Sequence, residues 1–142
     1  MQSRFIVPAD SAAMRQVEGF VAAFVKEHEV AADDAARILI LLEELLTNLA
    51  KYGYSDRAEP GVAEIELVLD GNRLEIEFID DGCAFDPSAG PLPELGEPLE
   101  ERPVGGLGLH LVRSLTDVVH YERRNDRNVI RLSRSLASTR TN

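Results

Sequence analysis

Three segments of the sequence combine residue types that can hold or activate a ligand. In the first, LLEELLTNLAKYGY, Glu44, Asn48 and Lys51 follow one another at intervals of four and three residues. In a helix this spacing places them on one polar stripe. The remaining positions are nearly all apolar, so a buried helix would need a polar partner for the stripe. The alternative is an exposed edge with an ordinary Glu–Lys arrangement. Glu43, about 100° around the helix, is the weaker functional acid.

The second segment, FIDDGCAFDP, follows a predicted strand, RLEIEFID, in which Asp80 falls in phase with the apolar side. A carboxylate there needs a hydrogen-bond donor. A nucleobase amine is one such donor, and Gly82 would let a flat ring approach the backbone. The alternative is a turn in which Asp80 bonds the backbone amides that follow it. We expect Cys83 to be a small residue lining this turn.

The third segment, RPVGGLGLHLV at residues 102 to 112, places Gly105, Gly106 and Gly108 before a helical pattern. Backbone amides at the start of a helix bind anions without any side-chain charge. No lysine follows these glycines, as one does in a Walker-type loop. Its absence excludes only that way of holding a phosphate. A glycine-rich linker is the alternative.

Hydrophobic periodicity predicts the elements that must position these segments. We expect a strand, two helices, a hairpin, a long loop, a helix and a second hairpin. They cover residues 3–8, 10–29, 33–52, 62–80, 87–104, 107–116 and 118–136. The order predicts an α+β fold, a two-layer sandwich of a mixed, mostly antiparallel sheet with helices on one face. One domain spans residues 1–136, and residues 137–142 are expected to be a disordered tail.

Composition limits the partners and the compartment. The 142 residues carry a net charge of −10, which disfavours direct binding to nucleic acid or to an anionic membrane. No apolar run is long enough to span a bilayer, and Cys83 is the only cysteine, so a cytoplasmic setting fits best. Positive charge is concentrated in YERRNDRNVIRLSRS, either on a solvated strand face or on a basic docking patch. His28, His110 and His120 show no metal-ligand spacing.

An E-x-x-x-N helix, a strand ending in D-x-G, a long loop and G-G-x-G leading into a helix occur in this order. The set resembles the N, G1 and G2 boxes of the GHKL (Bergerat-fold) ATP-binding family. The resemblance is greatest to its small stand-alone branch, the bacterial anti-sigma-factor serine/threonine kinases. It depends on EELLTNLAKYGY, DDGCAFDP and GGLGLHLV, and it extends over roughly residues 3 to 136.

The resemblance implies a role for each matching residue. Asn48 matches the asparagine that binds Mg²⁺, Glu44 the general base, and Asp80 the adenine-binding aspartate. Lys51 matches a basic position near the phosphates. Two further sets occupy nucleotide-binding segments of the family. The G1 box contains Gly82, Ala84 and Phe85. The glycine loop, whose amides face the phosphates, contains Gly105, Gly106, Leu107, Gly108 and Leu109. Ala84 departs from the family, which has a second glycine there; we expect it to be tolerated.

Residues 87–104 would then be the ATP lid. Arg102, near its end, matches a lid arginine that contacts the γ-phosphate in some relatives, and a solvated arginine paired with Glu100 or Glu101 is the alternative. The resemblance further implies ATP and Mg²⁺ as cofactors and phosphorylation of a serine or threonine on a STAS-type anti-sigma-factor antagonist. It also implies binding of a sigma factor and, as in many relatives, a homodimer. An ATP-binding partner switch without transfer, and a domain that binds no nucleotide, are the alternatives.

Overall fold

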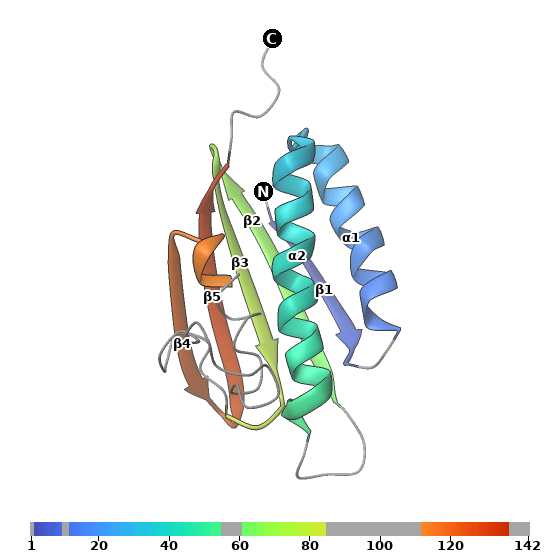
Figure 1. The fold of residues 1–142 in the computed structure, drawn as a ribbon, viewed down its shortest axis with the longest axis vertical. Coiled ribbons are helices and arrows are strands. Elements are labelled where there is room, and N and C mark those ends of the chain that lie inside the picture. Colours follow the sequence, from blue (N-terminus) through green and yellow to red (C-terminus); the bar gives the residue numbers. More distant parts are fainter. Residues whose placement is uncertain (1, 10–11, 55–60, 85–111, 137–142) are drawn as a thin grey trace, which may run out of the picture.

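The computed structural model describes residues 2–9, 12–54, 61–84 and 112–136. Its elements are β1 (Gln2–Pro8), α1 (Ala13–His28), α2 (Ala32–Asn48), a π-helical turn (Leu49–Gly53), β2 (Val62–Asp70), β3 (Arg73–Asp80), β4 (Val118–Arg124) and β5 (Arg127–Ser135). One five-stranded sheet forms a layer, and both long helices lie on one of its faces (Figure 1). The α+β two-layer class is therefore confirmed. The helix expected at 107–116 is described from residue 112, and residues 112–114 are helical.

The strand order is β1-β2-β3-β5-β4, and all four pairings among the described strands are antiparallel. The parallel pairing that a mixed sheet implies does not occur among them. Two tight turns join the hairpins. Gly71 has a φ of 63° between β2 and β3, and Asn125 and Asp126 have φ values of 53° and 62° between β4 and β5. Such left-handed residues match the twist of paired strands.

The core lies between the sheet and the two helices. Alternate residues of β2 and β3 are buried, as their pattern predicted, and α2 is buried along most of one side. Helix α1 closes the β1 edge, where Phe5 and Phe20 stack with ring centroids 5.0 Å apart. It begins at Ala13, and the expected capping residues Asp10 and Ser11 lie outside the described residues. Within the described ranges, no helix combines the length and apolar composition needed to span a membrane.

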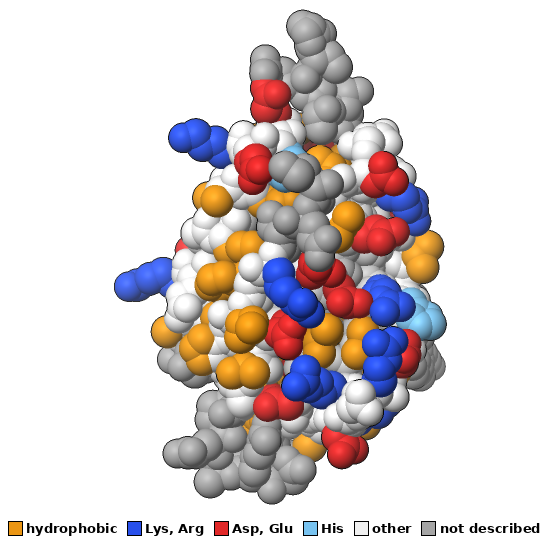
Figure 2. All heavy atoms as spheres, turned by 180° about the vertical axis from the view of Figure 1, so that it is seen from behind, with side chains coloured by type: hydrophobic (Ala, Val, Ile, Leu, Met, Phe, Trp, Pro, Cys, Tyr) orange, Lys and Arg blue, Asp and Glu red, His pale blue; other side chains and the backbone are white. Residues whose placement is uncertain are grey.

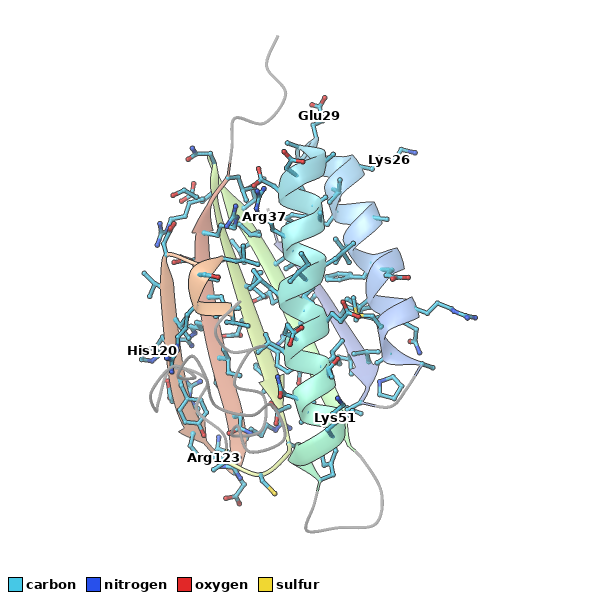
Figure 3. All side chains as sticks on the ribbon, viewed as in Figure 1. Lys26, Glu29, Arg37, Lys51, His120 and Arg123 are labelled. Atoms are coloured by element: carbon cyan, nitrogen blue, oxygen red, sulfur yellow. The ribbon has the colours of Figure 1, made fainter. Side chains whose placement is uncertain are left out.

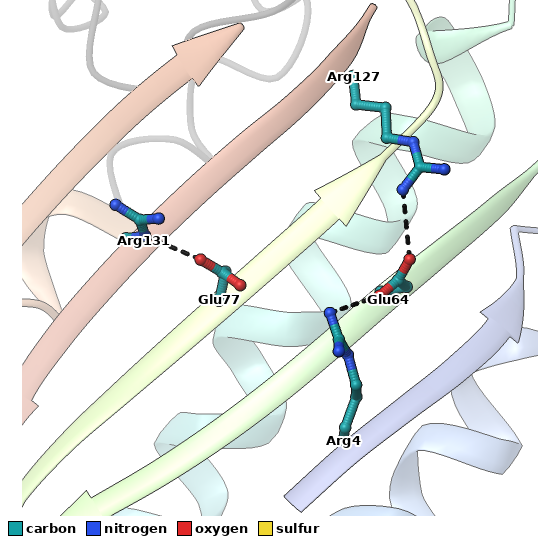
Figure 4. Close-up of polar contacts among 5 residues, drawn as sticks. All are labelled: Arg4, Glu64, Glu77, Arg127 and Arg131. Carbon is teal, nitrogen blue, oxygen red and sulfur yellow. Dashed lines mark hydrogen bonds and ion pairs between the residues drawn. The ribbon is translucent and has the colours of Figure 1, made fainter. Parts of the chain in front are cut away.

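On the other face of the sheet lies no helix of the described ranges, and charged side chains cover much of it (Figure 2). Ion pairs join neighbouring strands there. Glu64 lies 2.9 Å from Arg4 and 3.4 Å from Arg127, and Glu77 lies 2.8 Å from Arg131 (Figure 4). Exposed pairs of this kind contribute about 0–1 kcal/mol each. The late concentration of positive charge thus belongs in good part to a solvated sheet face, the first of the two interpretations above.

Candidate functional site

Four elements finish or begin at the same end of the molecule. Helix α2, β3 and β4 end there and β5 begins there, so segments far apart in the sequence become neighbours (Figure 1). Asp80, the last residue of β3, pairs with Asn128 near the start of β5. The π-helical turn after α2 meets the D-x-G turn after β3 at this end. Single π-turns are rare in helices and are found frequently at functional sites.

A cavity of about 80 Å³ lies between these elements. A single water molecule needs roughly 10–15 Å³ on the same scale, so the cavity has room for a larger group. Its walls are mainly apolar with a few polar groups, the composition typical of a ligand site. The described residues that line it are Leu45, Asn48, Leu49, Gly53, Phe78, Asp80, Cys83, Ala84, Asn128 and Ile130.

Asp80 is the acidic group of the cavity, and only 5% of the residue is exposed. Its Oδ1 accepts hydrogen bonds from the backbone N–H of Gly82 at 2.8 Å and from Nδ2 of Asn128 at 2.9 Å. No donor among the described residues reaches Oδ2. Burial raises the pKa of this carboxyl, and the two hydrogen bonds oppose the rise. The bond to the N–H of Gly82 is the turn contact that the second interpretation predicted, and the same side chain also lines the cavity. The contact with a nucleobase amine stays a prediction.

Gly82 is required by a contact between two turns. The backbone N–H of Cys83 donates to the carbonyl of Gly53 at 2.7 Å. A Cβ on Gly82 would lie 2.9 Å from that carbonyl oxygen and 2.9 Å from the side chain of Leu49. A side chain at this position would therefore push the D-x-G turn away from the π-helical turn. The close neighbour is protein backbone, where the sequence had suggested a flat ring.

Asn48 is buried and lines the same cavity. Its Nδ2 donates to the backbone carbonyl of Glu44 at 2.8 Å, one turn earlier in α2. This bond uses one of the two amide hydrogens and fixes the orientation of the amide, and no donor among the described residues reaches its oxygen, which can therefore serve as a ligand. Glu44 is half-buried and does not line the cavity, although it lies on the adjacent turn.

Lys51 is exposed in the π-helical turn and does not line the cavity either. Spacing alone predicted one polar stripe of Glu44, Asn48 and Lys51. Glu44 and Asn48 lie one turn apart in α2, but Lys51 follows in the π-helical turn, where the helical period changes. Figure 3 shows Lys51 and Arg123 at the same end of the molecule, one from the end of the helix and one from β4. Ala84 lines the cavity. The remaining predicted site residues lie outside the described residues: Phe85, Arg102, Gly105, Gly106, Leu107, Gly108 and Leu109.

Three residues of the final hairpin belong to the site and were not predicted. Asn128 lines the cavity, the hydroxyl of Tyr121 donates to its Oδ1 at 2.6 Å, and Arg123 donates to the carbonyl of Gly82 at 2.8 Å. The alternation of residues along the strand could have identified Asn128. Asn128 alternates with the apolar Ile130 and Leu132, which marks it as a polar residue on the inward side of its strand.

A separate hydrogen bond lies on the outer side of the D-x-G turn. The hydroxyl of Tyr54 donates to Oδ1 of Asp81 at 2.7 Å, and neither residue lines the cavity. Burial, together with this bond to Asp81, raises the pKa of the Tyr54 phenol. The bond connects the end of the π-helical turn to the end of β3.

Comparison with known proteins agrees with this geometry. The model of the family described as histidine kinase-like ATPase domain matches residues 7–134. Serine-protein kinase RsbW of Bacillus cereus (strain AH820) is 36% identical over 94 residues, covering 61% of this chain and 56% of the relative. RsbW of Bacillus anthracis matches with the same identity and coverage. The chain thus spans little more than half the length of the curated relatives that it matches.

Solved structures share the fold at low identity. A crystal structure of the RsbU and RsbW domains of a Mycobacterium tuberculosis protein superposes with a TM-score of 0.67 at 17% identity, over 99% of this chain and 35% of that one. A blue-light activated histidine kinase of Erythrobacter litoralis gives 0.52 at 22% identity, over 91% and 42%. Since the family model extends from β1 into β5, the chain belongs to the histidine kinase-like ATPase domain family.

Proposed function

We propose that this protein binds Mg-ATP in the cavity at the end of α2 and β3 and phosphorylates a serine or threonine of an anti-sigma-factor antagonist. The observation that carries the proposal is the pairing of Asp80 and Asn48 on one cavity. A buried carboxylate with a free acceptor oxygen and a buried amide oxygen face the same space. In a chain of this ATPase family, these groups suit the two ends of a nucleotide.

At the base end, Oδ2 of Asp80 suits the exocyclic amine of adenine. The surrounding walls include Phe78, Leu45 and Ile130, which offer apolar surface to a flat ring. A ligand that fills the cavity and excludes water has to pair this oxygen, because leaving a carboxylate oxygen buried and unpaired is costly. An amine donor would satisfy the one oxygen that the protein leaves without a partner among the described residues.

At the phosphate end, the amide oxygen of Asn48 suits Mg²⁺, which prefers hard oxygen ligands. When bound, Mg²⁺ would neutralise charge on the triphosphate. A neutral amide supplies an oxygen without repelling the phosphates. Lys51 and Arg102 are the proposed cationic partners of the phosphates. The proposed amide cradle is the loop that contains Gly105, Gly106, Leu107, Gly108 and Leu109.

Glu44 is the proposed general base, one helical turn before Asn48. The transfer forms a bond between the hydroxyl oxygen of the antagonist and the γ-phosphorus, and it breaks the bond to the oxygen that bridges the β- and γ-phosphates. ADP leaves, and Glu44 takes up the hydroxyl proton. The proposed partners are a STAS-type antagonist and a sigma factor in the cytoplasm, with a homodimer as the working form. They are the partners that the resemblance to the anti-sigma-factor kinases implies, and the name of the relatives, serine-protein kinase, supports transfer to a protein serine.

A second candidate function is an ATP-binding switch that transfers nothing. The position of Glu44 favours it, because this half-buried residue does not line the described cavity. A base must lie within hydrogen-bond reach of the proton that it removes, although such contacts often tighten only in the reactive complex.

The two candidates are separated by one experiment. The chain, γ-labelled ATP, Mg²⁺ and a STAS-type antagonist are incubated with wild-type protein, Glu44→Gln and Glu43→Gln. We expect label on the antagonist with wild type and with the exposed control Glu43→Gln, and at least about a hundredfold slower labelling with Glu44→Gln. Binding of Mg-ATP without labelling would establish the switch instead. No thermal shift at millimolar Mg-ATP would exclude both candidates, because a ligand at 100 times its Kd adds about 2.7 kcal/mol to stability.

A further inference from the structure

Asn128 and Tyr121 form a short hydrogen-bonded chain behind Asp80. The Tyr121 hydroxyl donates to Oδ1 of Asn128 at 2.6 Å, and Nδ2 of Asn128 donates to Oδ1 of Asp80 at 2.9 Å. The same Nδ2 donates to the carbonyl of Cys83 at 2.7 Å and lies 3.5 Å from the carbonyl of Gly82. The strand register produces this contact, because Asp80 and Asn128 are direct partners across β3 and β5.

The amide of Asn128 has one satisfactory orientation. On its nitrogen side lie the acceptors, a carboxylate oxygen and two backbone carbonyls, and on its oxygen side lies a hydroxyl donor. A flipped amide would set Oδ1 against these acceptors and would lose the hydrogen bonds to Asp80 and Cys83. The hydroxyl of Tyr121 would keep a partner, because it can accept from an N–H group as well as donate. Because 2% of Asn128 is exposed, water cannot repair those losses.

The fixed amide determines what the cavity offers to a ligand. Both hydrogens of Nδ2 are directed to protein acceptors, so Asn128 has no donor to give to a base. Its bond also occupies Oδ1 of Asp80, together with the N–H of Gly82. Of the Asp80–Asn128 pair, the atom left for a base is Oδ2 of Asp80, which only accepts when the carboxyl is ionised.

We infer that Asn128, held by Tyr121, is a positioning residue that makes the cavity select a purine with a 6-amino group over a purine with a 6-oxo group. The inference rests on the proposed function, since it concerns the base of the bound nucleotide. A 6-oxo group would face an acceptor with no hydrogen between them. The 6-oxo ring has an N–H at N1, but it must shift to present that group to Asp80, away from the position in which a 6-amino group meets Oδ2, and Phe78 and Ile130 line the cavity in which it would have to move.

ADP and IDP provide a matched pair of probes, because they differ in the 6-amino and 6-oxo groups and in the proton on N1. Their affinities are measured by calorimetry on the whole chain in the presence of Mg²⁺. Wild type should bind ADP at least about tenfold more tightly than IDP, since a site built around a hydrogen bond rejects a ligand that leaves it unpaired. Asn128→Ala should bring this ratio to within about threefold, mainly through weaker ADP binding.

Tyr121→Phe retains the amide and removes only the hydroxyl that holds it, so it tests the inference even if Asn128→Ala does not fold. It should lower the ADP:IDP ratio by about threefold or more. Tyr54→Phe is the matched control. It removes another hydroxyl bond of 2.7 Å, to Asp81 on the outer side of the turn, and should keep the wild-type ratio. Simple destabilisation would weaken both nucleotides together and leave the ratio unchanged.

Two results would overturn the inference alone: equal affinity of wild type for ADP and IDP, or a wild-type ratio in both Asn128→Ala and Tyr121→Phe. Failure of wild type to bind either nucleotide would overturn the proposed function and the inference with it. A ratio that falls in both variants and holds in Tyr54→Phe would establish the role of Asn128.

Discussion

The carboxylate of Asp80 is ionised at a cost that its surroundings only partly offset. Burial raises its pKa above the usual value of 3.8, and the bonds from Asn128 and Gly82 lower it again without cancelling the rise. The folded protein therefore holds this proton more tightly than the unfolded chain does. The contribution of Asp80 to stability is fully present below the unfolded pKa and is lost as the pH rises through the higher folded pKa. At neutral pH the charged carboxylate therefore lowers the free energy of unfolding, while it presents an acceptor oxygen at the cavity.

Asp80→Asn tests this balance. An amide oxygen can accept both hydrogen bonds that Oδ1 of Asp80 accepts now, and no charge has to be buried. We expect the variant to be at least as stable as wild type at neutral pH, with its advantage shrinking as the pH falls toward 4. It should bind ADP at least about tenfold more weakly, because an N–H group replaces the acceptor oxygen. Thermal unfolding across pH 4–8 and calorimetry measure the two effects. A variant less stable than wild type at neutral pH would mean that the charge itself holds the turn together.

At the scale of elements, the site depends on two turns that touch through glycine. Gly53 ends the π-helical turn and Gly82 lies in the turn after β3, and each has the other within contact distance. The backbone bond from Cys83 to Gly53 joins the two turns at 2.7 Å. Asn48 and Asp80 reach the same cavity because this contact holds the end of α2 against the end of β3.

Gly82→Ala should separate the two turns. The added methyl group would meet the carbonyl oxygen of Gly53 at 2.9 Å, and that backbone can yield only if the turns move apart. We expect a loss of about 1–3 kcal/mol in the free energy of unfolding, measured in urea, and at least about tenfold weaker ADP binding. Gly19→Ala is the control, since nothing lies within 4 Å of its added methyl group in α1, and it should stabilise the protein by about 0.5–1 kcal/mol. Full stability and full ADP affinity in Gly82→Ala would show that the contact does not position the site.

Periodicity in the sequence predicted the layers of the whole molecule, because burial on one face leaves a local signal in every strand and helix. The inward phase of Asp80 and the place of Asn48 as a polar residue on a largely buried helix followed from the same signal. The sequence did not predict the contacts between distant segments. Nothing local indicates that Gly53 lies against Gly82, or that Asn128 bonds Asp80 across 48 residues. The π-helical turn was missed because its residues fit an ordinary α-helix equally well.

Arg134 connects three parts of the molecule from its place in β5. Its Nη1 donates to the carbonyl of Leu115, and its Nη2 lies 3.5 Å from Oδ1 of Asp34 at the start of α2. Asp34 is 2% exposed, whereas 18% of the Arg134 side chain is exposed. Nε of Arg134 is buried without a hydrogen-bond partner among the described residues, so the guanidinium is held by its two terminal nitrogens. The pair thus ties α2 and the segment before β4 to the sheet.

Arg134→Met should destabilise the whole domain by about 2–4 kcal/mol, since it removes one partner of a largely buried ion pair and leaves the carboxylate of Asp34 in place. Arg131→Met provides the control on the same strand. Its ion pair with Glu77 lies on the open face and is 48% exposed at the arginine, so the loss should stay below about 1 kcal/mol. Urea unfolding followed by circular dichroism measures both. Asp34→Asn added to Arg134→Met should recover part of the loss, because the double variant also removes the buried negative charge that has lost its arginine. Equal effects of the two arginine substitutions would show that the link from β5 to α2 contributes no more than a surface ion pair.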